Sequence, residues 1–178
     1  MERVSIIIDG SNFYHRLKES DLKKHLLAFR YDLFASFLLS GRIGAWKRYY
    51  IGAIREERGN PKSHSLMIDQ QKLIGRLTRD KWEIQFGHML KTDGYHEKGV
   101  DVLMSVDMLV GAYENQYDTL ALVSSDTDLI PALAKIRSMN KRVEYIGFSS
   151  LPSYGLIKHS DIRRLLTQGD LERFFTDK

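Results

Sequence analysis

Short, mostly apolar runs alternate along the chain with longer segments in which apolar residues recur at helical spacing. Residues 4–8 and 120–123 are the clearest runs, and such a pattern is typical of strands covered on both faces. Residues 65–80 instead place their apolar side chains on one face of a helix. Strands are predicted at 4–8, 46–51, 82–86, 120–123 and 142–146, with a short further strand at 162–166. Helices are predicted at 12–20, 33–39, 65–80, 101–112 and 128–139, with shorter ones at 152–158 and 171–175.

Polar segments separate several of these elements. Residues 55–64 and 88–98 are rich in charged residues and contain glycine or proline, so both are predicted to be loops. Asp32 is the predicted N-cap of the helix at 33–39, and Gly41 is predicted to end that helix.

The alternation of strands and helices predicts an α/β fold with three layers, α/β/α, around a central, mainly parallel sheet. Right-handed crossovers then limit the possible topologies. If the first strand lies at the centre, the five main strands, numbered along the chain, take the order 3-2-1-4-5. In this order the second and third strands lie on one side of strand 4–8 and the fourth and fifth on the other. The switch point is therefore between strands 4–8 and 120–123, which is where ligands collect in open α/β sheets.

The composition narrows the class of protein. The chain has 178 residues and no cysteine, and its net charge is +4. We expect one domain over residues 1–178, without disulfides or thiolate metal sites. No apolar run approaches membrane-spanning length and Glu2 and Arg3 precede the first strand, so we expect a cytoplasmic protein without a signal peptide. The charge permits a polyanionic partner, and the oligomeric state stays open, a homodimer included.

Acidic residues follow the two strands at the switch point. Asp9 comes directly after residues 4–8, and Asp126 comes shortly after residues 120–123. Asp101 opens the helix that leads into strand 120–123, so its side chain is expected at the same sheet edge. Each acid also has a simpler explanation, since Asp9 begins good turn chemistry and acids suit the first turn of a helix. Their convergence at one edge favours a functional site.

Three segments carry a family resemblance. Asp9-Gly10-Ser11-Asn12, Lys98-Gly99-Val100-Asp101 and Ser124-Ser125-Asp126-Thr127-Asp128 resemble the motifs of NYN domains in the PIN-like nuclease superfamily. The chain is similar to bacterial stand-alone members, including the tail at 153–156 and Asp161. One departure is Ser125, where the family often has glycine; this change alters the turn and leaves the number of carboxylates unchanged.

The resemblance implies a PIN-like, Rossmannoid fold, a carboxylate cluster that binds Mg²⁺ or Mn²⁺, and hydrolysis of RNA as an endoribonuclease. Hard cations of this kind prefer oxygen ligands and keep several waters. The expected metal ligands are Asp9, Asp101 and Asp126. Asp128 is a further catalytic candidate, as a ligand or by orienting a water molecule. Asp107 lies six residues beyond Asp101, roughly 9 Å along a helix, so it is expected behind the ligands.

The RNA is expected to be single-stranded or looped, because unpaired RNA can thread over a shallow pocket. Basic residues and tyrosines near the carboxyl-end loops are candidates to contact it, and His15 could face the site although a surface position is the ordinary expectation. The predicted substrate-binding residues are Asn12, Lys98, Ser124, Ser125, Arg55 and Arg58.

Two other classes of function remain as alternatives. A non-catalytic RNA-binding module would keep the same fold without hydrolysis. A doubly wound cofactor enzyme is disfavoured, because Asp9-Gly10-Ser11-Asn12 replaces the glycine-rich phosphate turn that such enzymes need.

Overall fold

The computed structural model describes residues 1–19, 26–54, 61–91 and 95–175. Its centre is a parallel sheet with the strand order β3-β2-β1-β6-β7-β8. The strands of this sheet are β1 (Arg3–Asp9), β2 (Ile43–Ile51), β3 (Glu83–Phe86), β6 (Thr119–Val123), β7 (Arg142–Phe148) and β8 (Ile162–Leu166). The predicted order is confirmed, and the short strand at 162–166 adds a sixth position beside β7.

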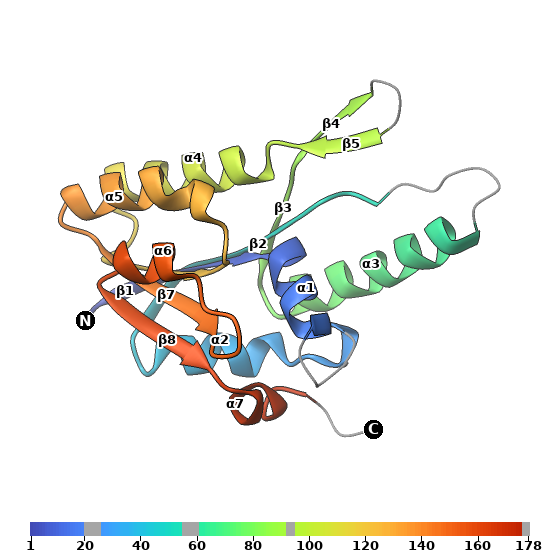
Figure 1. Cartoon of the computed structure of the whole chain (residues 1–178), viewed down its shortest axis with the longest axis horizontal. Helices are drawn as coiled ribbons and strands as arrows, with labels where there is room; N and C mark the ends of the chain where they lie inside the picture. Colours follow the sequence, from blue (N-terminus) through green and yellow to red (C-terminus); the bar gives the residue numbers. More distant parts are fainter. Residues whose placement is uncertain (20–25, 55–60, 92–94, 176–178) are drawn as a thin grey trace.

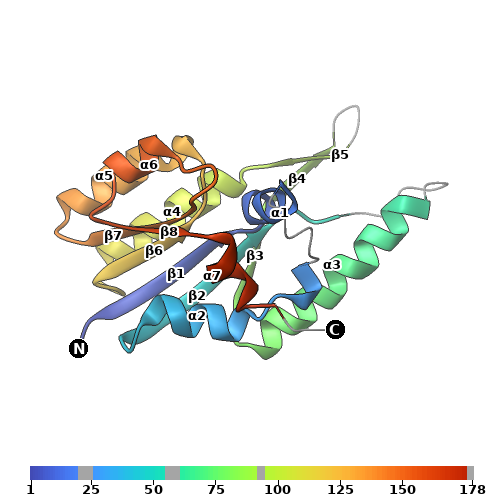
Figure 2. The ribbon, with the colours of Figure 1, turned by 60° about the horizontal axis from the view of Figure 1, so that its bottom comes forward.

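Helices cover both faces of the sheet (Figure 1). The α-helices are α1 (Gly10–Glu19), α2 (Tyr31–Leu39), α3 (Pro61–Arg79), α4 (Val100–Tyr113), α5 (Ile130–Ser138), α6 (Tyr154–Lys158) and α7 (Gln168–Glu172). Two short 3-10 turns, η1 (Leu26–Ala28) and η2 (Thr127–Leu129), complete the described helical segments. Helices α1, α2, α3 and α7 pack on one face and α4, α5 and α6 on the other (Figure 2).

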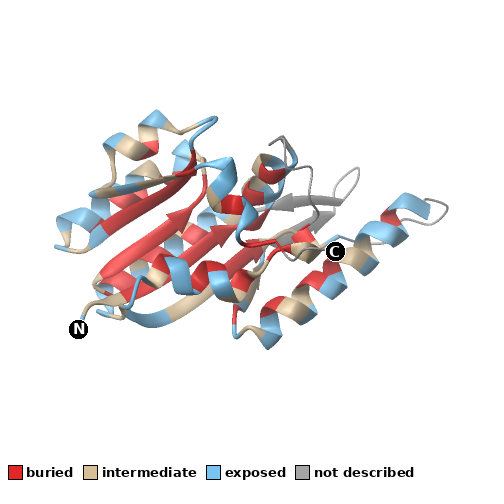
Figure 3. Cartoon of the chain, turned by 90° about the horizontal axis from the view of Figure 1, so that it is seen from below, coloured by how far each residue is buried: buried red, intermediate tan, exposed pale blue. Residues whose placement is uncertain are grey.

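The side-chain alternation of β1 explains why both faces need cover. Ile6 and Ile8 point into the core beneath α1 and α2, whereas Ile7 points into the core beneath α4 and α5. All three side chains are fully buried, and Figure 3 shows the burial along the central strands. A strand buried on both faces has no use for alternating polar residues, which accounts for its continuous apolar sequence.

An aromatic cluster fixes α1 against the sheet. Phe13 of α1 is 1% exposed, and its ring centroid lies 5.1 Å from that of Phe29 and 5.9 Å from that of Phe34. Burying one such ring contributes about 1.5–3 kcal/mol. The helix that follows Asp9 is therefore held in place by its own apolar face, which matters for the site at its start.

The prediction of a loop at 88–98 was wrong. Residues His88–Lys91 and Tyr95–Lys98 form β4 and β5, an antiparallel two-stranded ribbon next to the main sheet. In Figure 1 this ribbon projects from the end of the molecule where α4 begins. The ribbon delivers the chain directly to Gly99 and the first turn of α4.

Several predicted helix boundaries were also wrong. Helix α3 begins at Pro61, inside the predicted loop, because proline is well tolerated in a first turn. Asp32 lies within the first turn of α2 and does not cap it; its carboxylate pairs with Arg30 at 2.7 Å. That helix ends at Leu39, and its C-cap is Ser40, whose backbone is left-handed, one residue before the predicted Gly41. Among the described helices, none has the length and apolarity needed to cross a bilayer.

The helix boundaries at the C-terminal end also differ from the prediction. Helix α7 spans Gln168–Glu172, a few residues before the predicted turn at 171–175. A capping box between Thr167 and Asp170 sets this start. Helix α5 begins at Ile130 after the η2 turn, so Asp128 lies in that turn and Pro131 in the first turn of the helix.

Candidate active site

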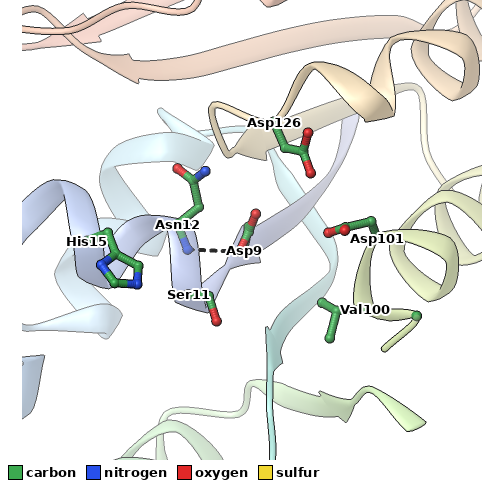
Figure 4. Close-up of a pocket in the computed structure, with 8 residues that line it drawn as sticks. Asp9, Ser11, Asn12, His15, Val100, Asp101 and Asp126 are labelled. Carbon is green, nitrogen blue, oxygen red and sulfur yellow. Dashed lines mark hydrogen bonds between the residues drawn. The ribbon is translucent and has the colours of Figure 1, made fainter. Parts of the chain in front are cut away.

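An open cavity of about 560 Å³ lies at the carboxyl end of β1. Three carboxylates from separate elements line it: Asp9 at the end of β1, Asp101 in the first turn of α4, and Asp126 after β6. Figure 4 shows these carboxylates pointing into the space between β1, α4 and the segment after β6. The remaining lining comes from Ser11, Asn12, His15, Gly99 and Val100.

Asp9 is the most enclosed of the three acids, with only 6% of its surface exposed. Its Oδ1 accepts a hydrogen bond from the backbone N–H of Asn12 (3.0 Å), and its Oδ2 accepts one from the Ser124 hydroxyl (3.0 Å). Burial raises the pKa of Asp9, and the negative charges of Asp101 and Asp126 raise it further. The two hydrogen bonds oppose this rise, because they stabilise the charged form.

Gly10 is required where β1 turns into α1. A Cβ at this position would lie 2.4 Å from the Tyr49 ring and 2.6 Å from the Tyr50 backbone oxygen. The adjacent strand β2 therefore leaves no space for a side chain. This close approach lets α1 begin directly after Asp9 and turns the Asn12 amide back onto the carboxylate.

The segment after β6 is held by hydrogen bonds to its own backbone and to Asp9. The Ser124 hydroxyl donates to Asp9 and accepts from the backbone N–H of Asp126 (3.1 Å). Asp126 in turn accepts from the backbone N–H of Asp128 (2.9 Å), as the N-cap of the η2 turn. Ser124 thus links the Asp9 carboxylate to the backbone of Asp126.

A second set of contacts joins α1 to the same segment. The Asn12 side-chain oxygen accepts from the Ser125 backbone N–H (3.1 Å) and from its hydroxyl (2.9 Å). The Arg16 guanidinium donates to the Ser125 hydroxyl at 2.9 Å. The hydroxyl at position 125, which departs from the family pattern, therefore bridges Asn12 and Arg16 in a way that glycine does not allow.

Asp101 reaches the cavity from the opposite side. Gly99 adopts a left-handed backbone with φ of 86°, which redirects the chain from β5 into α4. The carboxylate of Asp101 lies at the exposed rim, yet neighbouring protein atoms desolvate it enough to raise its pKa. The charges of Asp126 and Asp128 raise it further. The site therefore gathers negative charge from four residues.

This geometry agrees with a sequence comparison. A family model described as the NYN domain matches residues 3–164. The chain belongs to the NYN domain family. The NYN domains belong to the PIN-like nuclease superfamily, and membership of this family suggests ribonuclease activity.

The fold is also found in a solved structure. A protein of unknown function from Vibrio parahaemolyticus superposes with a TM-score of 0.71 and 23% sequence identity, covering 98% of this chain and 96% of that one. At this identity the likeness shows a shared fold alone. No curated protein matches the chain.

The donor set of this NYN domain fits a hard divalent cation. Three carboxylates from β1, α4 and the segment after β6 offer oxygen ligands around one open cavity, and the sequence has no cysteine to favour a softer metal. Within the described residues, no three acidic or histidine side chains lie close enough together to hold a metal ion by themselves, so a cation here would need further ligands. That arrangement suits Mg²⁺, which is usually bound through one or two carboxylates, retained waters and substrate phosphate.

The other predicted catalytic residues lie further out. Asp128 is exposed and does not line the cavity, although its charge acts on Asp101. Asp107 accepts a hydrogen bond from the Tyr50 hydroxyl (2.6 Å) and lies 3.6 Å from Arg48. Tyr50 is the β2 residue in register with Asp9. Asp107 is thus connected to Asp9 only through Tyr50, and its supporting role stays a prediction.

The predicted substrate-binding residues divide into two groups. Asn12 lines the cavity, while Ser124 and Ser125 lie in the hydrogen-bonded segment beside it. Arg55 and Arg58 lie outside the described residues, as does the side chain of Lys98.

Sequence reasoning gave two lining residues too little weight. Ser11 follows Gly10 in the first turn of α1, and His15 lies one helical turn later on the same face. The signal was available, since residues four apart on a helix are neighbours. His15 is exposed as expected and also borders the cavity.

Proposed function

We propose that this NYN domain is an endoribonuclease that requires Mg²⁺ or Mn²⁺ and cleaves RNA at the Asp9–Asp101–Asp126 cavity. The observation that carries the proposal is the convergence of three carboxylates, from elements far apart in the sequence, on one open cavity. Membership of a family that suggests ribonuclease activity supports the same conclusion.

The electrostatics of the cavity support a cation there. Burial and mutual repulsion raise the pKa values of Asp9 and Asp101, so the charged cluster is costly without a counterion. A structural role alone gives no reason to hold acids together in this way. Asp9, Asp101 and Asp126 would hold the cation, directly or through water. The cation would supply Lewis acidity toward the phosphate and toward an attacking water molecule.

The protein groups around the carboxylates have positioning roles in this proposal. Ser124 and the Asn12 backbone N–H fix the Asp9 carboxylate, so its orientation does not depend on substrate. Asn12 keeps its own side-chain oxygen on Ser125, which leaves its amide N–H groups to donate toward a phosphate oxygen. Asp128 adds negative charge near Asp101 and orients Asp126 through its backbone.

Unpaired RNA, either single-stranded or in a loop, is the proposed substrate. The cavity is open, so it can admit a flexible backbone, whereas a rigid duplex needs a shaped groove. Lys98, Arg55 and Arg58 are proposed to bind the phosphate backbone beside the cavity. The location of these basic residues stays a prediction from the sequence.

A cleavage assay with matched variants tests the proposal. Labelled single-stranded RNA should be cut by the parent protein with Mg²⁺ or Mn²⁺ and left intact with EDTA. Asp101→Asn and Asp126→Asn should each reduce the rate by at least about a hundredfold, since each removes charge that holds the cation. Glu114→Gln is the control, because Glu114 is an exposed acid at the other end of α4 and loses the same charge.

The outcomes separate three cases. Equal cleavage by the parent and by both aspartate variants would indicate a contaminating nuclease and would remove the support for this site. RNA binding without cleavage, under every metal condition, would favour the non-catalytic RNA-binding module. Loss of cleavage in Glu114→Gln as well would indicate a general effect of charge rather than the cavity.

A further inference from the structure

A second cavity adjoins the carboxylate site on the other side of α1. Its volume is about 420 Å³, within the roughly 300–1,000 Å³ typical of small-molecule sites. It lies between α1 and α3, because residues of both helices line it. Ser11 lines both cavities, and Gly10, which follows Asp9 in the sequence, lines the second. The two cavities are therefore neighbours on opposite sides of one helix start.

The second cavity has an apolar interior. Leu26, Ile51 and Leu73 contribute buried or half-buried side chains, and Leu66 and Ile54 contribute exposed ones. On α3 the lining residues recur at helical spacing, so one face of that helix forms a wall. Exposed apolar surface of this kind, placed beside a polar site, indicates a ligand with an apolar face.

Basic and aromatic groups border this apolar interior. Lys18 and Tyr14 come from α1 and Lys62 from the start of α3. The Lys18 ammonium lies 5.8 Å from the centroid of the Tyr14 ring. The lining also contains one acid, Asp69, which lies 3.6 Å from Lys72 on its own helix. Lysines beside an apolar slot match a ligand that combines a flat apolar ring with a phosphate.

A polar group lies in the wall of the cavity. Gln70 is 8% exposed; its side-chain amide donates to the Gly52 backbone oxygen and accepts from the Ile54 backbone N–H (2.8 Å). These bonds fix the amide between α3 and the segment that follows β2. They use one donor and one acceptor of a group that has two of each, so the amide keeps the capacity to meet the polar edge of a ring.

We infer that the α1–α3 cavity is a nucleotide subsite that takes one unpaired base of the RNA chain whose backbone crosses the carboxylate cavity. This inference rests on the proposed function for its substrate class. The apolar interior accepts the faces of the base, and Lys18 and Lys62 attract the adjoining phosphates. A base enters such a slot only after leaving the stack, so the subsite selects single strands, loops and bulges over duplexes.

Two substitutions on the same helix test the subsite. Leu66 and Ile68 are exposed apolar residues of α3, with 43% and 37% of their surfaces exposed, and only Leu66 lines the cavity. Leu66→Glu places a charge in the slot, while Ile68→Glu places the same charge outside it. Both positions are exposed enough for the fold to persist, which circular dichroism should check.

The measurement is binding of a short labelled single-stranded RNA by fluorescence anisotropy, with Ca²⁺ in place of Mg²⁺ to suppress turnover. Leu66→Glu should weaken binding by about tenfold, the size expected for losing one stacked base. Ile68→Glu should change it by no more than about twofold, as expected for one added surface charge. The same RNA made with abasic positions should bind the parent about tenfold more weakly and should bind Leu66→Glu with little further loss.

Equal losses in the two variants, or a parent protein indifferent to abasic RNA, would overturn the subsite. The proposed function is judged separately, by metal-dependent cleavage in the parent protein. Cleavage that persists while Leu66→Glu and Ile68→Glu behave alike would remove the subsite alone. A selective loss of RNA binding in Leu66→Glu, in a parent that never cleaves, would remove the nuclease activity and keep the subsite.

Discussion

Asp9 shows how a single residue can be fixed in place and electrostatically costly at once. Hydrogen bonds from Asn12 and Ser124 hold its carboxylate, while burial and the charges of Asp101 and Asp126 oppose ionisation. A residue selected for stability alone would not combine these features. Sites of this kind commonly trade stability for chemistry.

This balance predicts a pH dependence of stability for Asp9→Asn. The folded pKa of Asp9 is raised above the ordinary 3.8, so the folded state holds this proton more tightly than the unfolded chain does. Asp9 therefore contributes most stability below pH 3.8, and the contribution is lost as the pH rises through the folded pKa. Because asparagine does not titrate, the stability of Asp9→Asn relative to the parent should increase across that interval.

Denaturant unfolding in EDTA, at several pH values from below 3.8 to neutral, measures this difference. The comparison with the parent at each pH cancels the contributions of acids that do not interact with Asp9, such as Asp118, whose pair with Arg3 lowers its pKa to about 2. A difference that stays flat, or that falls as the pH rises, would contradict the raised pKa of Asp9.

At the scale of the element, α1 connects the site to the core. Its start is tied to Asp9, its middle to the aromatic cluster through Phe13, and its Arg16 to Ser125. Gly10 makes this arrangement possible by allowing β2 to approach closely. The helix therefore transmits changes in packing directly to the carboxylate cavity.

Replacing Gly10 by alanine should be strongly unfavourable, and a second glycine provides the control. In Gly10→Ala the new Cβ meets the buried Tyr49 ring and the Tyr50 backbone, so β2 or α1 must shift. We expect a loss of about 1–3 kcal/mol in the free energy of unfolding. Gly75 lies within α3 with open space around it, so Gly75→Ala should stabilise the protein by about 0.5–1 kcal/mol. Chemical denaturation of the two variants should therefore give shifts of opposite sign, and equal shifts would contradict the close approach at Gly10.

Elements that are buried in the core could be predicted from the sequence, and elements outside the core could not. The strands of the main sheet carry continuous apolar runs because helices cover both faces, and these runs revealed β1 and β6 together with the sheet order. The β4–β5 ribbon is outside the main sheet, and its polar sequence offers no periodic signal. Its assignment needed the backbone pairing itself.

Some features of the candidate site could also be predicted from the sequence, and others could not. The convergence of Asp9, Asp101 and Asp126 followed from topology, since parallel strands end at one edge. The bridge from Arg16 to Ser125 spans 109 positions and depends on side-chain packing that no local pattern encodes. The α1–α3 cavity could not be predicted either, because the pattern of its wall residues on α3 is that of an ordinary amphipathic helix.

At the scale of the whole molecule, the site lies where elements from different parts of the fold meet. Asp9 belongs to the central strand, Asp101 to a helix on one face, and Asp126 to the segment after the neighbouring strand. A cation shared by these residues would link the two halves of the sheet and the layer that contains α4. Binding only to the folded state should therefore raise the stability of the entire domain.

Thermal unfolding with Mn²⁺ tests this coupling. At a hundredfold excess over the dissociation constant, a ligand of the folded state adds about 2.7 kcal/mol, which corresponds to roughly 5–10 °C in Tm for a chain of this size. The parent and Glu114→Gln should show this rise, and Asp126→Asn should show much less of it. Without metal, Asp126→Asn should be as stable as the parent or more stable, because it removes repulsion from Asp9 and Asp101 while asparagine can still accept the Asp128 backbone N–H. An equal Mn²⁺ shift in the parent and Asp126→Asn would place the cation elsewhere on the molecule.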